Sequence, residues 1–213
     1  MKRNIDYSLY LVTDRELMYA DSIEECVEQA VRGGCTIVQL REKNADSREF
    51  YETALRVRKI TADLGVPLLI NDRADIALAV DADGVHIGQE DLPLEAARRI
   101  LGKDKIIGVS AGNADEARAA ADAGADYLGV GAMFATGTKT DANPASMDEL
   151  RRIRAEVSIP IVAIGGINKN NVQLFAGTGI DGIAVVSAIV SQKDVCGAAR
   201  ELKAMYKKII GNS

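Results

Sequence analysis

The sequence has 213 residues, of which 47% are hydrophobic and 27% charged, and it carries a formal net charge of −5. Such a chain can bury a sizeable core, and its length favours one domain over residues 1–213. The acidic balance, without a basic run, argues against nucleic acid and anionic membranes as partners. No apolar stretch reaches the length of a membrane span and no signal peptide is recognisable, so we expect a cytoplasmic protein.

Short runs rich in Val, Ile and Leu alternate with segments of helical periodicity along the whole chain. The predicted strands are Ser8–Val12, Thr36–Leu40, Pro67–Ile70, Gly84–Ile87, Ile106–Val109, Tyr127–Val130, Ile161–Ile164 and Gly182–Val185. Helical periodicity is clearest at Ser47–Leu64, Ala114–Ala123 and Ala198–Ile210. Nearly continuous apolar strands indicate a parallel sheet that helices cover. The sequence therefore predicts an α/β fold, a single-domain (β/α)8 TIM barrel.

Weak internal repeats support a barrel built of quarter units. Asp81–Gly88, Ala123–Gly131 and Thr178–Val185 each contain a turn, an aspartate and then a strand, and Gly33–Gln39 has the same place at the second strand. A doubly wound open sheet is the competing fold. It would carry a G-x-G-x-x-G loop after the first strand, where this chain reads Val-Thr-Asp-Arg, so the barrel is preferred.

In a β/α barrel, the active site lies at the carboxyl ends of the strands. Arg41 and Lys43 alternate on the extended segment after the second strand, so both side chains can point the same way. Together with Lys139 they can neutralise a pyrophosphate group. The alternative is ordinary surface charge.

Two carboxylates, Asp72 and Asp91, follow neighbouring strands and suit a Mg²⁺ ion that bridges substrate phosphates. Either aspartate alone reads equally well as a turn cap. Asp75 and Glu90 are expected to face solvent or neighbouring loops.

The last two strand ends predict a second anion site. Gly165 and Gly166 follow the seventh strand and Ser187 ends the eighth, where many barrels bind phosphate through backbone N–H groups. Glycines also form tight turns, which is the alternative.

The segment from Ala132 to Pro144 lacks strand or helix periodicity, and we expect it to close over substrate and deliver Lys139. The alternative is a merely flexible insertion. His86, the only histidine, alternates with Val85 and Ile87 and is expected to line the barrel in a structural role.

These motifs resemble the thiamine-phosphate synthase family over nearly the whole chain. The motifs that carry the resemblance are Gln39-Leu-Arg-Glu-Lys43, Asn71-Asp-Arg73, Gly84-Val-His-Ile-Gly-Gln-Glu-Asp91, Gly108-Val-Ser110, Thr136-Gly-Thr-Lys139 and Ile164-Gly-Gly-Ile167. The resemblance implies a transferase that joins hydroxymethylpyrimidine diphosphate to a thiazole phosphate and releases pyrophosphate. Both substrates are small molecules, and Mg²⁺ is the implied cofactor.

The resemblance also implies a role for each matching residue. The pyrimidine diphosphate would be held by Gln39, Arg41, Lys43, Asn71, Ser110 and Lys139, of which Arg41, Lys43, Ser110 and Lys139 would act in catalysis. Magnesium would be bound by Asp72 and Asp91. The thiazole phosphate would be held by Thr136, Gly137, Thr138, Gly166, Val186 and Ser187.

Two departures from the family pattern bear on rival functions. Phe134-Ala135 stands where many relatives have a proline, and Ala111-Gly-Asn follows Ser110 where relatives often have a histidine. A thiazole tautomerase-like isomerase would use that histidine, so the synthase is preferred. A non-catalytic sensor of thiamine phosphates is a further alternative. The sequence leaves open whether the chain forms a homo-oligomer and whether its thiazole substrate carries a carboxylate.

Overall fold

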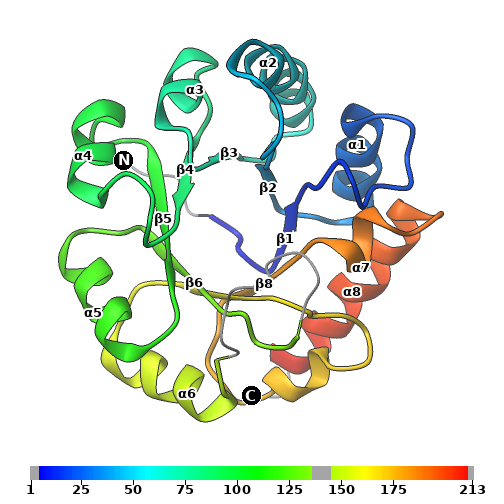
Figure 1. Ribbon diagram of the computed structural model, residues 1–213. Coiled ribbons are helices and arrows are strands. Elements are labelled where there is room, and N and C mark those ends of the chain that lie inside the picture. Colours follow the sequence, from blue (N-terminus) through cyan, green and yellow to red (C-terminus); the bar gives the residue numbers. More distant parts are fainter. Residues whose placement is uncertain (1–4, 136–144, 211–213) are drawn as a thin grey trace.

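The computed structural model describes residues 5–135 and 145–210, in which eight parallel strands close into a barrel (Figure 1). Consecutive strands pair around the ring, and β1 closes it by pairing with β8. The strands are β1 (Leu9–Val12), β2 (Ile37–Leu40), β3 (Leu68–Asn71), β4 (Gly84–Ile87), β5 (Ile106–Ala111), β6 (Tyr127–Val130), β7 (Ile161–Ile164) and β8 (Gly182–Val185). The predicted TIM barrel is confirmed.

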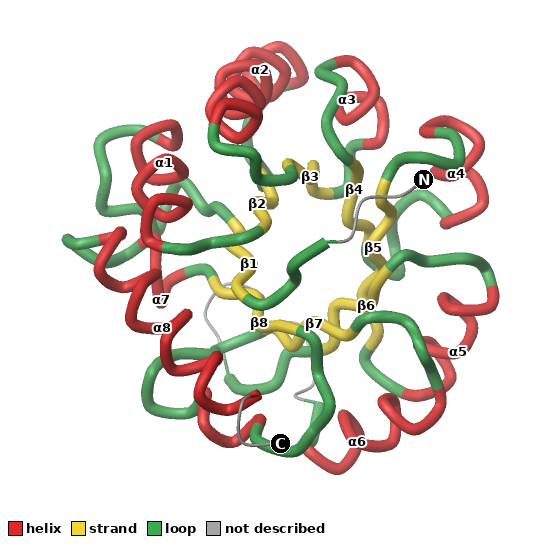
Figure 2. The backbone as a smooth tube through the Cα atoms, turned by 180° about the vertical axis from the view of Figure 1, so that it is seen from behind, coloured by secondary structure: helices red, strands yellow, loops and turns green. Residues whose placement is uncertain are grey.

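Helices form a ring around the strands, as Figure 2 shows from behind. They are α1 (Ile23–Gly33), α2 (Ser47–Asp63), α3 (Ala74–Ala79), α4 (Leu94–Leu101), α5 (Ala114–Asp122), α6 (Met147–Glu156), the 3₁₀ helix η1 (Val172–Phe175), α7 (Ser187–Val190) and α8 (Val195–Ile210). In the described part of the chain, no helix combines the length and apolar character needed to cross a membrane.

Four helices begin with the same capping pattern. A Ser, Asp or Asn side chain accepts a hydrogen bond from the backbone N–H of a glutamate three residues later, which satisfies a donor that the helix itself cannot pair. The pairs are Ser22 with Glu25, Asp46 with Glu49, Asn113 with Glu116 and Ser146 with Glu149.

Two apolar layers hold the fold together. The larger fills the space between the strands and the helices, as the apolar strands predicted. The smaller lies inside the barrel and consists of Tyr7, Tyr10, Val12, Ile37, Leu69, Ile106, Tyr127, Val162 and Ala184. Three of its nine members are tyrosines, and a buried phenol needs a hydrogen-bond partner. The barrel interior is therefore partly polar.

The quarter units appear as a repeated pair of hydrogen bonds at the amino ends of the strands, which we call the strand staple. In each unit, the residue just before an even-numbered strand donates its N–H to the carbonyl of one residue on the preceding odd-numbered strand, at 2.8 Å. The side chain of the donating residue in turn accepts a hydrogen bond from the N–H of that odd-strand residue. The four staples join Leu9 to Thr36, Leu68 to Asp83, Ile107 to Asp126 and Ile161 to Asp181. The three aspartates also pair with Arg58, Arg98 and Arg154.

Candidate active site

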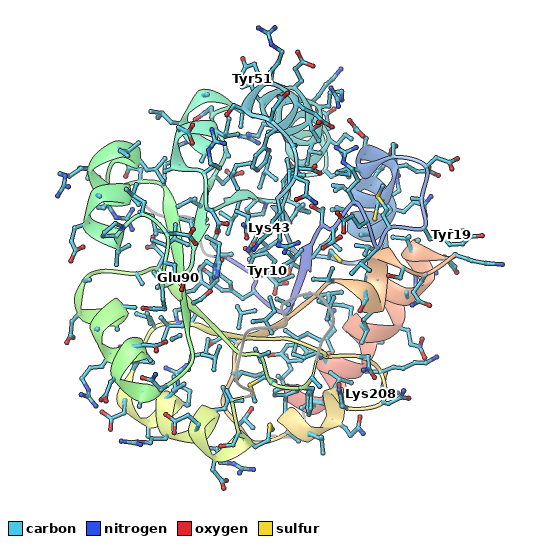
Figure 3. All side chains as sticks on the ribbon, viewed as in Figure 1. Tyr10, Tyr19, Lys43, Tyr51, Glu90 and Lys208 are labelled. Carbon is cyan, nitrogen blue, oxygen red and sulfur yellow. The ribbon has the colours of Figure 1, made fainter. Side chains whose placement is uncertain are left out.

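The cationic segment after β2 is held by the loop after β1. Arg41 Nη1 lies 2.7 Å from Asp14 Oδ2, and both side chains are largely buried. The Arg41 backbone N–H also donates to Thr13 Oγ1 at 2.9 Å. Lys43 is exposed, and Figure 3 shows it near Tyr10 at the centre of the barrel as seen along the axis. The structure thus fixes Arg41 more firmly than Lys43.

Asp72 and Asp91 come together as the sequence predicted. Burial is the largest cause that raises the pKa of Asp72 to about 6. A side-chain hydrogen bond between Asp72 and Asp91 and the negative charge of Asp91 contribute to the same rise. Arg41 and Lys43 act in the opposite direction on the same pKa, so both cations lie within electrostatic reach of the carboxylates. Four of the predicted site residues therefore form one cluster.

The backbone orients both carboxylates. Asp72 has φ 63°, a left-handed conformation that Asp and Asn tolerate better than most residues, and its N–H donates to the His86 carbonyl at 2.8 Å. Asp91 Oδ2 accepts the N–H of Gly88 at 2.7 Å. By contrast, Asp75 is exposed and pairs with Arg73, and Glu90 is exposed, as expected for both.

A chain of hydrogen bonds crosses the barrel interior from Gln39 to Ser110. Gln39 Nε2 donates to Tyr10 Oη at 2.8 Å, and Tyr10 Oη lies 2.9 Å from Tyr127 Oη. The chain continues from Tyr127 Oη to His86 Nδ1 at 2.8 Å and from His86 Nε2 to Ser110 Oγ at 3.0 Å. His86 thus lines the barrel, as predicted, but it also contacts a predicted site residue.

The strand register explains how this chain forms. His86 on β4, Gly108 on β5 and Tyr127 on β6 are cross-strand neighbours. A Cβ atom on Gly108 would lie 2.1 Å from the Tyr127 ring, so glycine alone lets the two side chains meet across β5. Gly129 does the same for His86, whose Cε1 atom would be 2.8 Å from an added Cβ.

The ends of β7 and β8 carry the predicted phosphate residues. Gly165 and Gly166 have φ angles of 99° and 66°, which favour glycine. The Gly166 carbonyl accepts hydrogen bonds from the side chains of Asn168 and Asn171, at 3.1 and 3.0 Å. Val186 and the exposed Ser187 stand at the start of the short helix α7. These residues directly follow β7 and β8, which are neighbouring strands of the ring.

A cavity of about 320 Å³ opens between the loops after β1 and β2, and Asp14, Arg41 and Lys43 contribute to its wall. Glu42 also lines it, and its Oε2 pairs with Arg15 Nε at 3.1 Å. Glu42 Oε1 is buried and has no hydrogen-bond partner in the described part of the chain. Burial raises the pKa of Glu42, and the hydrogen bond from Arg15 opposes this shift.

Four predicted site residues, Thr136, Gly137, Thr138 and Lys139, lie outside the described residues. The sequence reasoning also missed partners that the structure reveals. Asp14 and the tyrosines of the barrel interior are the main ones. The tyrosines could have been recognised in the sequence, because they occupy inward-facing strand positions where aliphatic residues are usual.

Fold and site together define a (β/α)8 barrel whose strand carboxyl ends combine paired carboxylates with cations. The chain belongs to the thiamine monophosphate synthase family, because the model of that family matches residues 9–189.

Individual relatives agree with this membership. The chain is 60% identical over 209 residues to the thiamine-phosphate synthase of Clostridium beijerinckii, covering 98% of this chain and 100% of the relative. It is 59% identical over 206 residues to that of Ruminiclostridium cellulolyticum, covering 97% and 98%. A solved structure of the thiamine phosphate pyrophosphorylase of Pyrococcus furiosus superposes with a TM-score of 0.90 at 44% identity, covering 97% of this chain and 98% of that one.

Proposed function

We propose that this chain is a thiamine-phosphate synthase that transfers the pyrimidinylmethyl group of hydroxymethylpyrimidine diphosphate to the nitrogen of a thiazole phosphate. The bond between the pyrimidine methylene carbon and the diphosphate oxygen breaks, and its electron pair leaves with pyrophosphate. The thiazole nitrogen supplies the pair for the new carbon–nitrogen bond. The observation that carries the proposal is the cluster of two carboxylates and two cations at the strand ends.

The residues after β2 to β5 form the diphosphate half of this site. Arg41 and Lys43 bind the leaving pyrophosphate and stabilise the charge that develops on it. Asn71, at the carboxyl end of β3, and Ser110, near that of β5, hold the same substrate from neighbouring strands. Lys139 supplies a further cation there. No protein nucleophile is required, because orientation and preorganised charge supply the catalysis.

Asp72 and Asp91 fit a magnesium ion. Two half-buried carboxylates that face each other are costly without a cation, and the raised pKa of Asp72 reflects that cost. In the described ranges, no group of three or more His, Cys, Asp or Glu residues forms a metal site. Magnesium needs no such cage, since one or two carboxylates and substrate phosphates suffice. When bound, it neutralises charge on the diphosphate.

The thiazole phosphate half is formed by the last two strand ends. Gly166, Val186 and Ser187 hold the monophosphate through backbone N–H groups and the serine hydroxyl. Thr136, Gly137 and Thr138 complete this half. The thiazole phosphate therefore binds after β7 and β8, and the pyrimidine diphosphate binds after β2 to β5.

Two rival functions are less well supported. A thiazole tautomerase-like isomerase would need a histidine just after Ser110, where this chain reads Ala111-Gly-Asn instead. A non-catalytic sensor would have no need of the paired carboxylates and the cations together. Neither rival accounts for the whole cluster.

An assay of the purified protein with both substrates tests the proposal. We expect thiamine phosphate and pyrophosphate to form with magnesium and their formation to stop when a chelator is added. Absence of product with magnesium, or equal product with chelator, would refute the assignment.

Asp14→Asn tests how Arg41 is held. The variant loses the charge of a largely buried ion pair but keeps the side-chain size. We expect the KM for the pyrimidine diphosphate to rise about tenfold with a smaller change in kcat, since hydrogen bonds to charged groups contribute roughly 1.5–3 kcal/mol.

Glu16→Gln is the matched control, because Glu16 lies on the same loop and bonds Asn44 instead of Arg41. Steady-state kinetics of both variants give the comparison. Equal KM values for the two variants would mean that Asp14 does not position Arg41.

A further inference from the structure

We propose that the hydrogen-bond chain from Gln39 to Ser110 has a fixed direction, and that His86 is the positioning residue that makes the Ser110 hydroxyl a donor toward substrate. The inference rests on the proposed role of Ser110 in binding the pyrimidine diphosphate. It goes beyond that role, because it states which atom donates the proton in each hydrogen bond from Gln39 to Ser110.

The direction starts at Gln39. Its Nε2 atom carries two protons and accepts none, so Tyr10 Oη must be the acceptor of this 2.8 Å bond. Gln39 is 4% exposed and Tyr10 is 1% exposed, so solvent does not compete for the pair. The single phenolic proton of Tyr10 is therefore left to donate to Tyr127 Oη.

The same counting carries the direction to the histidine. Tyr127 accepts from Tyr10 and so donates its own proton to His86 Nδ1, 2.8 Å away. An accepting Nδ1 atom makes the neutral imidazole carry its proton on Nε2. Burial raises the pKa of both Tyr10 and Tyr127, which keeps the two phenols protonated and able to donate.

The last step sets the state of Ser110. His86 Nε2 donates to Ser110 Oγ at 3.0 Å, which occupies a lone pair of the hydroxyl. None of the hydrogen bonds from Gln39 to Ser110 uses the proton of that hydroxyl. Ser110 is half-buried near the carboxyl end of β5, and Gln89 donates to its backbone carbonyl. The residue is thus held at both its oxygen atoms. Its proton can point to an acceptor on the substrate, such as a diphosphate oxygen.

The protonated nitrogen of His86 can be measured directly, because the protein contains one histidine. Protein labelled with ¹⁵N-histidine gives the resonances of a single imidazole, and these report which nitrogen is protonated. For the ligand-free wild type at neutral to slightly alkaline pH, we expect the neutral form with the proton on Nε2. The neutral form with the proton on Nδ1, or an imidazolium, would overturn the proposal. This measurement needs no turnover, so it stands even if the synthase assay fails.

Variants test whether the neighbours set the tautomer. Tyr127→Phe removes the donor to Nδ1 and is expected to leave both neutral tautomers populated. Gln39→Glu replaces the starting donor by an acceptor of the same size and is expected to move the proton to Nδ1. Tyr206→Phe is the control, because Tyr206 is equally buried and donates to the Ile180 carbonyl outside the chain. An unchanged tautomer in Tyr127→Phe would contradict the proposal.

A double-mutant cycle tests whether the hydrogen bonds from Gln39 to Ser110 contribute to catalysis. We expect Tyr127→Phe to lower kcat/KM for the pyrimidine diphosphate about tenfold in the wild type and less than about twofold in a Ser110→Ala background. A general packing defect would instead lower activity equally in both backgrounds. Equal effects would therefore reject the link to Ser110, whereas a wild type without activity would reject the proposed function itself.

Discussion

Asp72→Asn is expected to lower turnover by about 100-fold or more and, at the same time, to stabilise the metal-free protein. Turnover is expected to fall because Asp72 is one of the two proposed magnesium ligands, and a metal ion contributes several kcal/mol to stabilising developing charge. The backbone should stay in place, since Asn also tolerates the φ of 63° at this position. Steady-state assays over a magnesium titration measure the first effect.

The gain in stability follows from the direction of the pKa shift. The folded-state pKa of Asp72 is about 6, above the model value of 3.8, so the folded protein holds this proton more tightly than the unfolded chain. Ionised Asp72 therefore costs stability as the pH rises from about 4 through about 6, and the cost persists above that range. One pKa unit corresponds to about 1.4 kcal/mol, and solvent screening of a half-buried group reduces the expected gain to about 1 kcal/mol at pH 8.

Thermal unfolding without magnesium, at pH 4 and pH 8, measures this gain, which should be present only at the higher pH. Asp75→Asn is the control, because the exposed Asp75 pairs with Arg73 and the hydrogen bond from Arg73 lowers its pKa. That variant should keep full activity. An Asp72→Asn protein that is less stable than wild type at pH 8 would contradict the repulsion between Asp72 and Asp91.

Gly108→Ala is expected to destabilise the fold by about 3 kcal/mol, because its new methyl group would lie 2.1 Å from the Tyr127 ring. Overpacking a core costs roughly 1–3 kcal/mol, and displacing Tyr127 also breaks buried hydrogen bonds to Tyr10 and His86. For a chain of this size, the melting temperature should fall by roughly 10 °C. Thermal unfolding followed by circular dichroism measures it.

Gly112→Ala provides the matched control four residues further along. There an added Cβ would meet only Glu116 Oε2, at an ordinary 3.6 Å, so the change in stability should stay within about 0.5 kcal/mol. If both variants melted at the same temperature, Gly108 would not be needed to let His86 and Tyr127 meet.

The eight strands were predictable because each is buried on both faces and therefore reads as an apolar run. The observed strand ends differ from the prediction by at most two residues, as at β5, which continues through Ser110 to Ala111. Helix α8 begins at Val195, three residues before the predicted start. Gly197 interrupts the helical pattern in the sequence, but its N–H is bound by the Asp194 side chain at 2.7 Å, which lets the helix start earlier.

The site was predictable only where position along a strand decides the outcome. The meeting of Asp72 with Asp91 follows from the rule that strand carboxyl ends converge. The pairing of Asp14 with Arg41 does not, because it joins two loops 27 residues apart through side-chain conformations. The hydrogen-bond chain was hidden for another reason. It depends on the register of three strands, in which Gly108 separates His86 from Tyr127.

The strand staples at the amino ends of the barrel also determine how high Asn71 and Ser110 stand. Both Asn71 and Ser110 come three positions after a stapled residue, Leu68 and Ile107 respectively. Each residue of a strand advances about 3.3 Å, so these two side chains are measured out to the same level, about 10 Å above their staples. A slip of one residue would break both bonds of a staple and turn the site residue to the other face of the sheet. The level of these two proposed substrate-binding side chains is thus set from the opposite end of the molecule.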